Sequence, residues 1–224
     1  MRTFRALTIA ASLTAAAVLL PSIASAQSGR QFKDAWFWGL KAGSLSLADS
    51  SQSYKQAPMV GVDWLITRTH GGLYISGSQS FFKRQAIALR DPVAGLDSGF
   101  RAIDLKNMRR LDVALMGFPG EHLRFHPYVG VGFSLGQVAS AQPEGPFGNT
   151  DQANATAQIV QNQRTAVAPM LIGGGQYRMT RFSVFGQATV VASNTNFLLY
   201  SGKPFDFGIE FGLRYNVGSS IDRN

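Results

Sequence analysis

The chain contains no cysteine, and beyond its N-terminal segment it contains no apolar run long enough to form a spanning helix. The missing cysteine excludes disulfide frameworks, thiol catalysis and cysteine-ligated metal sites. A spanning helix needs roughly 18 or more consecutive apolar residues, so helical membrane insertion of the mature chain is excluded as well. Stability must therefore come from burial or from closure of the backbone hydrogen bonding.

Charge is also sparse, with 21 Lys and Arg and 13 Asp and Glu giving a formal net charge of +8. The bases are scattered or lie in connections, and they form no helix or stripe of the kind that nucleic-acid-binding proteins carry. Nucleic acid is therefore not an expected partner.

The N-terminal segment has the three parts of a secretory signal peptide. Arg2 and Arg5 precede an apolar run over 6–20, and the small residues of 24–26 form a cleavage site. A signal peptide over residues 1–26 is therefore predicted, followed by a single mature domain over 27–224. Loss of the two arginines leaves 19 Lys and Arg less 13 Asp and Glu, a net charge of +6.

The mature chain shows strict alternation of apolar and polar residues. In "FDFGIEFGLRYNV" (205–217) every odd position is aromatic or aliphatic, and every even position is polar, charged or glycine. A period of two predicts a half-buried β-strand. Eight strands are expected, although the facing of the third and sixth is left open: 36–46, 58–66, 72–82, 109–118, 125–136, 165–177, 182–191 and 205–217.

The connections between these strands alternate between short and long. Only a few residues join the second strand to the third, the fourth to the fifth and the sixth to the seventh. Transmembrane β-barrels combine short periplasmic turns, long outer loops, an even strand number and about 10 residues per strand. The sequence therefore predicts an all-β fold, an eight-stranded antiparallel up-and-down transmembrane β-barrel with short periplasmic turns and long extracellular loops.

The polar faces of the clearest strands combine glycine with four charged residues, Lys41, Asp63, Glu210 and Arg214. The interior of an eight-stranded barrel is only wide enough to be filled by side chains, so glycines would make room for these long ones. Because an unpaired charge away from water is costly, we expect a salt-bridged lumen charge cluster that narrows or closes the barrel. The alternative is independent solvated charges in a wet lumen, since shear could separate them.

Four aromatic residues, Trp36, Trp38, Trp64 and Tyr215, fall toward the periplasmic ends of their predicted strands. Aromatic residues gather at the membrane interfaces of transmembrane barrels, so these four are expected to form an aromatic girdle. Ordinary core aromatics of a soluble β-protein are the alternative interpretation.

With these features the mature chain resembles the small bacterial outer-membrane β-barrel proteins, the OmpA, OmpX and OmpW-like group. The likeness lies in the strand and loop pattern, and Glu210, Gly212, Tyr215 and Val217 match the order of that group's C-terminal assembly signal. The group usually has an aromatic residue where Val217 stands. The resemblance implies a location in the bacterial cell outer membrane, contact with its lipids, insertion by the barrel-assembly machinery and a monomeric state.

No residue pattern predicts catalysis, a metal site or a cofactor. His70, His122 and His126 are expected at or near the periplasmic turns, and their spacing matches no zinc motif. Some barrels of this size act on lipid A through serine and histidine, but no serine follows His126 by two residues. The chain is therefore not expected to be an enzyme.

Two of the long connections have a distinctive composition. The third, residues 137–164, is rich in Gln, Asn and Ala and is expected to be mobile. The second is basic, and a cationic outer rim would suit the phosphates of lipopolysaccharide or an anionic partner, with solvated loop charge as the alternative. Its charged residues, taken with the start of the next strand, are Lys83, Arg84, Arg90, Arg101, Lys106, Arg109 and Arg110 against Asp91, Asp97 and Asp104.

We therefore expect a structural or surface-interaction barrel with a polar, mostly closed lumen. The alternative is a narrow channel or carrier for small or hydrophobic solutes, as proposed for OmpW-like barrels; the four lumen charges argue against an apolar conduit low in the barrel. A soluble periplasmic barrel that binds lipid inside would need an apolar interior and a polar exterior, which is the opposite of what the alternation over 205–217 suggests. The solute, partner and process are not predicted, because in this fold they depend on the long loops.

Overall fold

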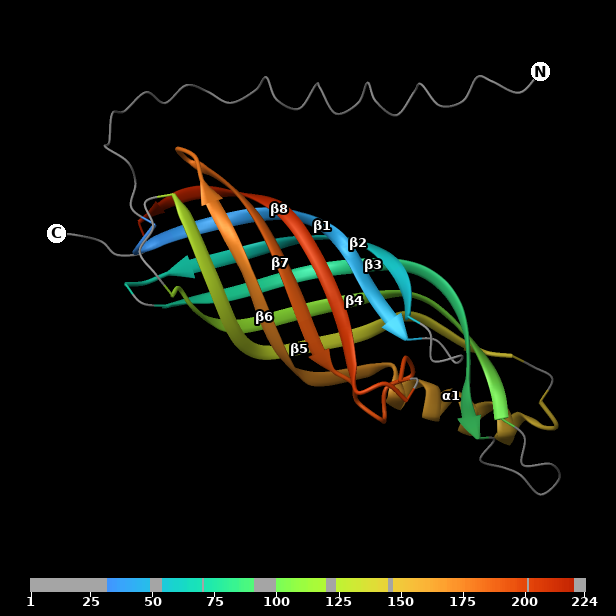
Figure 1. Cartoon of the computed structure of the whole chain (residues 1–224). Helices are drawn as coiled ribbons and strands as arrows, with labels where there is room; N and C mark the ends of the chain where they lie inside the picture. The colour runs from blue at the N-terminus through green and yellow to red at the C-terminus, as the bar shows by residue number, and fades with distance from the viewer. Residues whose placement is uncertain are drawn as a thin grey trace, which may run out of the picture.

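The computed structural model describes residues 32–48, 54–69, 71–90, 100–119, 124–144, 147–200 and 202–219. Eight antiparallel strands close into one barrel in which β1 pairs with β8 (Figure 1). The predicted all-β, eight-stranded up-and-down fold is confirmed, and the predicted signal peptide lies outside the described residues. The strands are β1 (Ala35–Ala48), β2 (Tyr54–Thr67), β3 (Gly71–Arg90), β4 (Phe100–Gly117), β5 (Phe125–Pro143), β6 (Thr165–Arg178), β7 (Phe182–Ala192) and β8 (Phe205–Ser219).

The alternating segment 205–217 forms β8 and closes the sheet. Its register places Leu213 opposite Leu40 and Tyr215 opposite Trp38 on β1. Closure gives every strand a paired neighbour on each side, which is the condition for placing β-structure in a lipid environment.

The two faces of the strands differ as their alternation predicts. Large apolar side chains such as Leu40, Leu115 and Phe211 are exposed on the outside of the barrel, while the charged residues point inward. The open question of facing is resolved for β3, where Tyr74 and Ser76 are buried inside, and for β6, where Met170 and Gln176 are. The exterior is thus apolar and the interior is largely polar.

Strands β3 and β4 extend much further than their alternation predicts. Their pairing continues from Lys83 opposite Lys106 up to Arg90 opposite Phe100. Much of the segment expected as a second long loop is therefore strand. The alternation was hidden by a bulge at Asn107, which has a positive φ of 54°. Inward-facing residues have even numbers after this bulge, as Arg110 shows, and odd numbers before it, as Leu105 shows.

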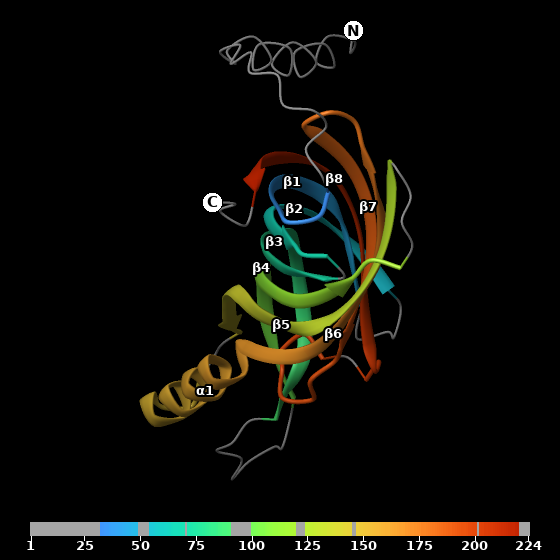
Figure 2. The ribbon, with the colours of Figure 1, turned by 90° about the vertical axis from the view of Figure 1, so that its left-hand side faces the viewer.

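The third long connection contains helix α1 (Thr150–Gln163), which lies at one end of the barrel beside β5 and β6 (Figure 2). The expectation of a mobile segment is wrong here, because alanine and glutamine favour helix. Asn149 caps α1 by accepting a 2.8 Å hydrogen bond from the Gln152 amide. Among the described residues no helix is both long and apolar enough to cross a membrane.

The interior of the barrel has three layers. At the end with the short turns, Phe32, Phe37, Leu65 and neighbouring side chains form one buried apolar cluster. At the end with the long connections, a second cluster includes Val160 of α1 and Leu198 of the segment between β7 and β8. The charged side chains of the lumen lie between these two clusters.

Candidate functional site: the charge network inside the barrel

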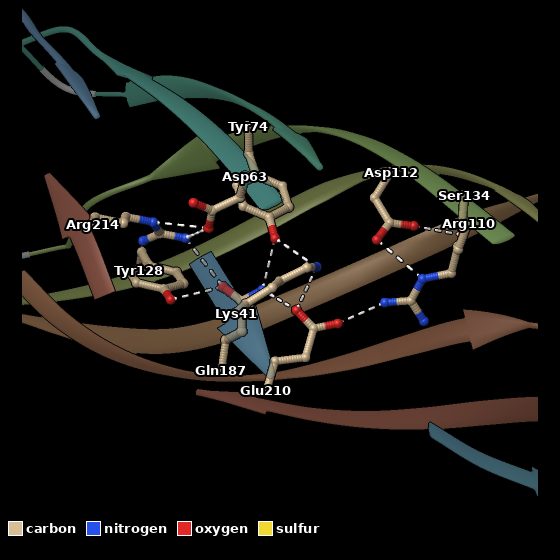
Figure 3. Close-up of polar contacts among 10 residues, drawn as sticks. All are labelled: Lys41, Asp63, Tyr74, Arg110, Asp112, Tyr128, Ser134, Gln187, Glu210 and Arg214. Carbon is tan, nitrogen blue, oxygen red and sulfur yellow. Dashed lines mark hydrogen bonds and ion pairs between the residues drawn. The ribbon is translucent and has the colours of Figure 1, made fainter. Parts of the chain in front are cut away.

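Six charged side chains meet between the two apolar clusters, and each is at most 4% exposed. They project inward from four strands and are held by the alternation that keeps every second residue inside (Figure 3). Three are cationic and three are anionic, so the network carries no net charge when all are ionised. They are Lys41 on β1, Asp63 on β2, Arg110 and Asp112 on β4, and Glu210 and Arg214 on β8.

Glu210 is the centre of one half of the network. Its two carboxylate oxygens lie 2.7 Å from Lys41 Nζ and 2.7 Å from Arg110 Nη2. Gln187 donates a third hydrogen bond of 2.7 Å. Because β4 lies four strands from β8 in an eight-stranded barrel, the contact between Arg110 and Glu210 crosses the lumen. A charged pair in this position blocks the interior directly.

Asp63 and Arg214 form the other half. Arg214 donates from Nε at 3.0 Å and from Nη2 at 2.6 Å to the same Asp63 oxygen. Its Nη1 donates to Gln176 at 2.8 Å, and its guanidinium carbon lies 3.8 Å from the centre of the Phe185 ring. The charge of Arg214 is therefore met by a carboxylate, an amide and an aromatic face.

Neutral side chains join the two halves. The Tyr74 hydroxyl accepts hydrogen bonds from Lys41 Nζ at 3.2 Å and from Gln187 Nε2 at 2.9 Å. Tyr128 donates to the Gln187 carbonyl oxygen at 2.9 Å, which brings β5 into the same network. Side chains from β1, β3, β5, β7 and β8 are thus tied together across the interior.

The structure brings all four predicted lumen residues into this network, as two ion pairs, Lys41 with Glu210 and Asp63 with Arg214. It does not show them as independent solvated charges. Arg110 belongs neither to a cationic outer rim nor to solvated loop charge, the two interpretations that the sequence left open for its basic segment, because its side chain is buried against Asp112 and Glu210.

Sequence reasoning thus missed Arg110 and Asp112 as members of the network. Their shared polar face with Ala114 in the predicted strand 109–118 was the signal that could have found them. The linking side chains Tyr74, Gln176 and Gln187 were missed as well, because polar and aromatic residues at those positions carry no pattern of their own.

The predicted girdle residues lie on the outer face near the short turns. The Trp38 ring stacks on Trp64 with centroids 5.5 Å apart, and Trp36 meets Trp64 edge-on at 5.4 Å. Tyr215 packs beside Phe182 at 5.2 Å. The placement suits a membrane interface, and the girdle role stays a prediction.

The residues of the predicted assembly signal divide between the two faces of β8. Glu210 is buried in the network and Gly212 points inward, whereas Tyr215 and Val217 are exposed outside. Their role in assembly stays a prediction. Gly212 has a structural reason of its own, since a Cβ there would lie 2.6 Å from the Phe185 ring.

Of the three histidines, His126 lies in the described part of the chain. Its ring stacks on Phe32 at 3.9 Å near the short-turn end. His70 and His122 lie outside the described residues. Within the described ranges no group of three or more His, Cys, Asp or Glu side chains is arranged to hold a metal ion.

No protein-family model matches the chain, and no curated protein matches it. Solved structures do match. Neisserial surface protein A superposes with a TM-score of 0.50 at 9% identity, over 80% of this chain and 96% of that one. The fold is that of an outer-membrane β-barrel protein. At this identity the likeness shows the fold and nothing about activity or partners.

Two further matches are Ail, the attachment invasion locus protein of Yersinia pestis, and the outer membrane protease OmpT from Escherichia coli. Ail has 8% identity and a TM-score of 0.48, over 82% of this chain and 99% of Ail. OmpT has 9% identity and a TM-score of 0.39, over 86% of this chain and 99% of OmpT.

Proposed function

We propose that this chain is a monomeric barrel of the bacterial outer membrane that serves as a closed, membrane-embedded scaffold for the surface formed by its long connections. The observation that carries this proposal is the inverted distribution of its side chains. A soluble antiparallel sheet turns its polar face to water, whereas this barrel turns its polar face inward. The outward apolar residues include Leu40, Val60, Leu115, Val131, Phe133, Leu171, Ile209, Phe211 and Leu213.

The filled interior supports a closed scaffold rather than a pore. The contact from Arg110 to Glu210 crosses the lumen, and a buried apolar cluster lies on each side of the charge network. An ion would have to displace these packed side chains to pass. The neisserial neighbour is named as a surface protein, which agrees with a surface role for this fold.

A charge placed on the outer face tests the membrane location. Leu171→Arg places a cation on a side chain that is 57% exposed in the middle of β6, and Met179→Arg is the matched change at a 58% exposed side chain in the short turn after β6. In lipid we expect Leu171→Arg to lower the free energy of unfolding by about 2–4 kcal/mol and Met179→Arg by about 1 kcal/mol or less. Equal, small losses in urea titrations of the vesicle-embedded protein would contradict a lipid-facing exterior.

Recordings in planar bilayers separate the scaffold from the narrow channel or carrier. We expect no steady openings from protein whose folding is verified by its heat-dependent gel mobility. Reproducible openings of one amplitude would support the channel instead. Their absence from a control bilayer without protein would show that the barrel produces them.

The outer halves of β3 and β4 support contact with lipid phosphates. Lys83 and Lys106 are paired directly across the two strands, and both are exposed, as is Arg109 on β4. Facing like charges repel, so an anion between them would be stabilising. We expect lipid A vesicles to stabilise the protein more than phosphatidylcholine vesicles, and the double change Lys83→Gln with Lys106→Gln to remove the difference. Arg124→Gln, at the opposite end, is the control and should retain it.

A further inference from the structure

A trough crosses the outer face of the barrel over β4, β5, β6 and β7, which lie side by side (Figure 1). Its volume is about 570 Å³, within the range of roughly 300–1,000 Å³ typical of small-molecule sites. None of the described residues that line it has a polar side chain. A ligand in this trough would therefore be held by apolar contacts alone.

Two rows of outward side chains form the banks of the trough. The register of the sheet aligns the first row across neighbouring strands: Leu73, Leu115, Val131, Leu171 and Val190. The second row lies two residues nearer the long connections: Val113, Phe133, Pro169, Ala192 and Phe205. Because a strand rises about 3.4 Å per residue, the two banks are about 7 Å apart.

The floor between the banks consists of residues whose side chains point into the barrel. Ala114 pairs with Gly132, and Gly132 pairs in turn with Met170. A Cβ at Gly132 would clash with the Val113 carbonyl and lie 2.6 Å from the Ala114 Cα, so β4 and β5 approach each other closely here. Glycine inside a strand permits such an approach or a tight bend, and the hollow of the trough lies over this point.

The trough is inclined to the barrel axis. Followed through its partners from strand to strand, the first row starts at Trp36 on β1 and returns to β1 at Ser46, ten residues further along. This stagger is the shear of the barrel. The trough therefore climbs from Leu73, near the short-turn end of β3, to Phe205 at the long-connection end of β8.

The length of the trough suits one extended acyl chain. From β3 to β8 there are five spacings of about 4.8 Å, which makes the trough about 24 Å long. Strands of transmembrane barrels tilt by about 35–45°, so a line across them lies about 45–55° from the membrane normal. One leaflet contributes about half of the 30 Å hydrocarbon core, and crossing it along such a line takes about 21–26 Å. The trough thus matches the path of one chain through one leaflet.

The width of the trough decides against a helix as its occupant. A helix with its side chains is about 10–12 Å across and does not fit between banks about 7 Å apart. We propose that the trough binds one acyl chain of a membrane lipid, and that it favours a straight chain because strand pairing fixes both banks. This lipid site goes beyond the scaffold function and rests on the proposed membrane location.

Three lysophosphatidylcholines that share a headgroup and a chain length test the proposal. The stearoyl chain is straight, the elaidoyl chain has a trans double bond and is nearly straight, and the oleoyl chain has a cis double bond and is bent. The readout is the NMR signals of the Val131 and Leu171 methyl groups in micelles of a short-chain detergent. Val60 and Val62, exposed on the outer face of β2, are the internal reference for general lipid contact.

We expect the stearoyl and elaidoyl probes to shift the Val131 and Leu171 signals saturably, with little change at Val60 and Val62. The oleoyl probe should bind about threefold or more weakly, because its bend forfeits several atom contacts with the banks. Similar binding of the elaidoyl and stearoyl probes would show that chain shape, and not the double bond itself, is recognised.

A variant and a matched control locate the site on β7. Ala192→Phe narrows the trough near its outer end and should weaken stearoyl binding by about threefold or more. Ala188→Phe makes the same change at an exposed position of the same strand, outside the trough, and should leave binding unchanged.

Several results would overturn the assignment. A linear response, or equal shifts at the trough and reference methyl groups, would mean general lipid contact and no site. Equal binding of the oleoyl probe would refute the preference for a straight chain, and unchanged binding in Ala192→Phe would place the chain elsewhere. Trough signals that shift with protein concentration before any probe is added would assign the trough to a second copy of the chain. Failure of the membrane location itself is distinguishable, because Leu171→Arg and Met179→Arg would then cost equally little.

Discussion

Arg214 and Asp63 form an ion pair across a strand that separates them. The two residues lie on β8 and β2, and β1 runs between these strands. In the register of the sheet, Gly39 of β1 is the partner of Asp63 on one side and of Arg214 on the other. The side chains therefore meet above Gly39, at 2.6 Å between Arg214 Nη2 and Asp63 Oδ2. The pair depends on the absence of a side chain at Gly39.

This arrangement predicts that Gly39→Ala is destabilising. A Cβ at Gly39 would clash with Asp63 and lie 2.9 Å from Arg214 Cγ. Forcing an extra methyl into a packed interior typically costs about 1–3 kcal/mol. The control is Gly77→Ala on β3, where a Cβ meets no atom of the described residues within 4 Å, and there we expect a change within about 0.5 kcal/mol. Urea unfolding in lipid vesicles measures the free energy of unfolding of both variants. Equal values for Gly39→Ala and Gly77→Ala would contradict the prediction.

Removing both members of the ion pair should cost less than the sum of the losses from removing each one alone. Asp63→Asn leaves the buried Arg214 without its carboxylate, and breaking a buried pair in this way typically costs about 3–5 kcal/mol. Arg214→Met should be similarly destabilising. In the double variant no unpaired charge remains, so its loss should be clearly smaller than the sum of the two single losses. Additive losses in the unfolding free energies would show that the two residues stabilise the barrel independently.

The N-terminal end of the described chain closes the short-turn end of the barrel. Phe32 packs on His126 and on Phe118, and the Thr67 hydroxyl donates to the Phe32 carbonyl. Phe32→Ala should therefore admit small reagents to the interior from this side. Because the chain has no cysteine, Ser183→Cys provides a single reporter at a fully buried position on β7.

We expect a water-soluble thiol reagent to label this reporter about tenfold faster in the Phe32→Ala background, the effect of lowering a local opening free energy by about 1.4 kcal/mol. Phe81→Ala, which truncates an exposed aromatic side chain in the middle of β3, is the matched background. Equal labelling rates in the two backgrounds would show that Phe32 does not close the barrel.

The cap of α1 predicts a local effect. Asn149→Ala removes the side-chain oxygen that accepts from the Gln152 amide, and loss of such a cap costs about 1 kcal/mol of helix stability. Amide hydrogen exchange should accelerate in the first turns of α1 and stay unchanged in β5 and β6. Gln158→Ala, on the exposed side of α1, is the control and should slow exchange or leave it unchanged. Faster exchange throughout β5 would instead mean that α1 supports the sheet.

The outcome for particular residues shows where sequence reasoning reached its limit. The inward positions of Lys41, Asp63, Glu210 and Arg214 follow from local alternation, because successive side chains of a strand point to opposite faces. Arg110 has the same local signal, but it follows a basic segment that looked like a loop. The bulge at Asn107 shifts the alternation there, and such a shift is set by pairing with the neighbouring strand.

The amino-acid sequence by itself determined the architecture. The strand number and the apolar exterior with its polar interior follow from the period of two, and the up-and-down barrel follows from the alternation of short and long connections. The tertiary structure alone decided which lumen side chains meet, because stagger between strands sets their relative heights. It paired Arg110 with Glu210 across the barrel, placed Asp63 and Arg214 over Gly39, and left Nη1 of Arg110 without a hydrogen-bond partner among the described residues. Contacts between residues far apart in the chain require the closed sheet to bring them together.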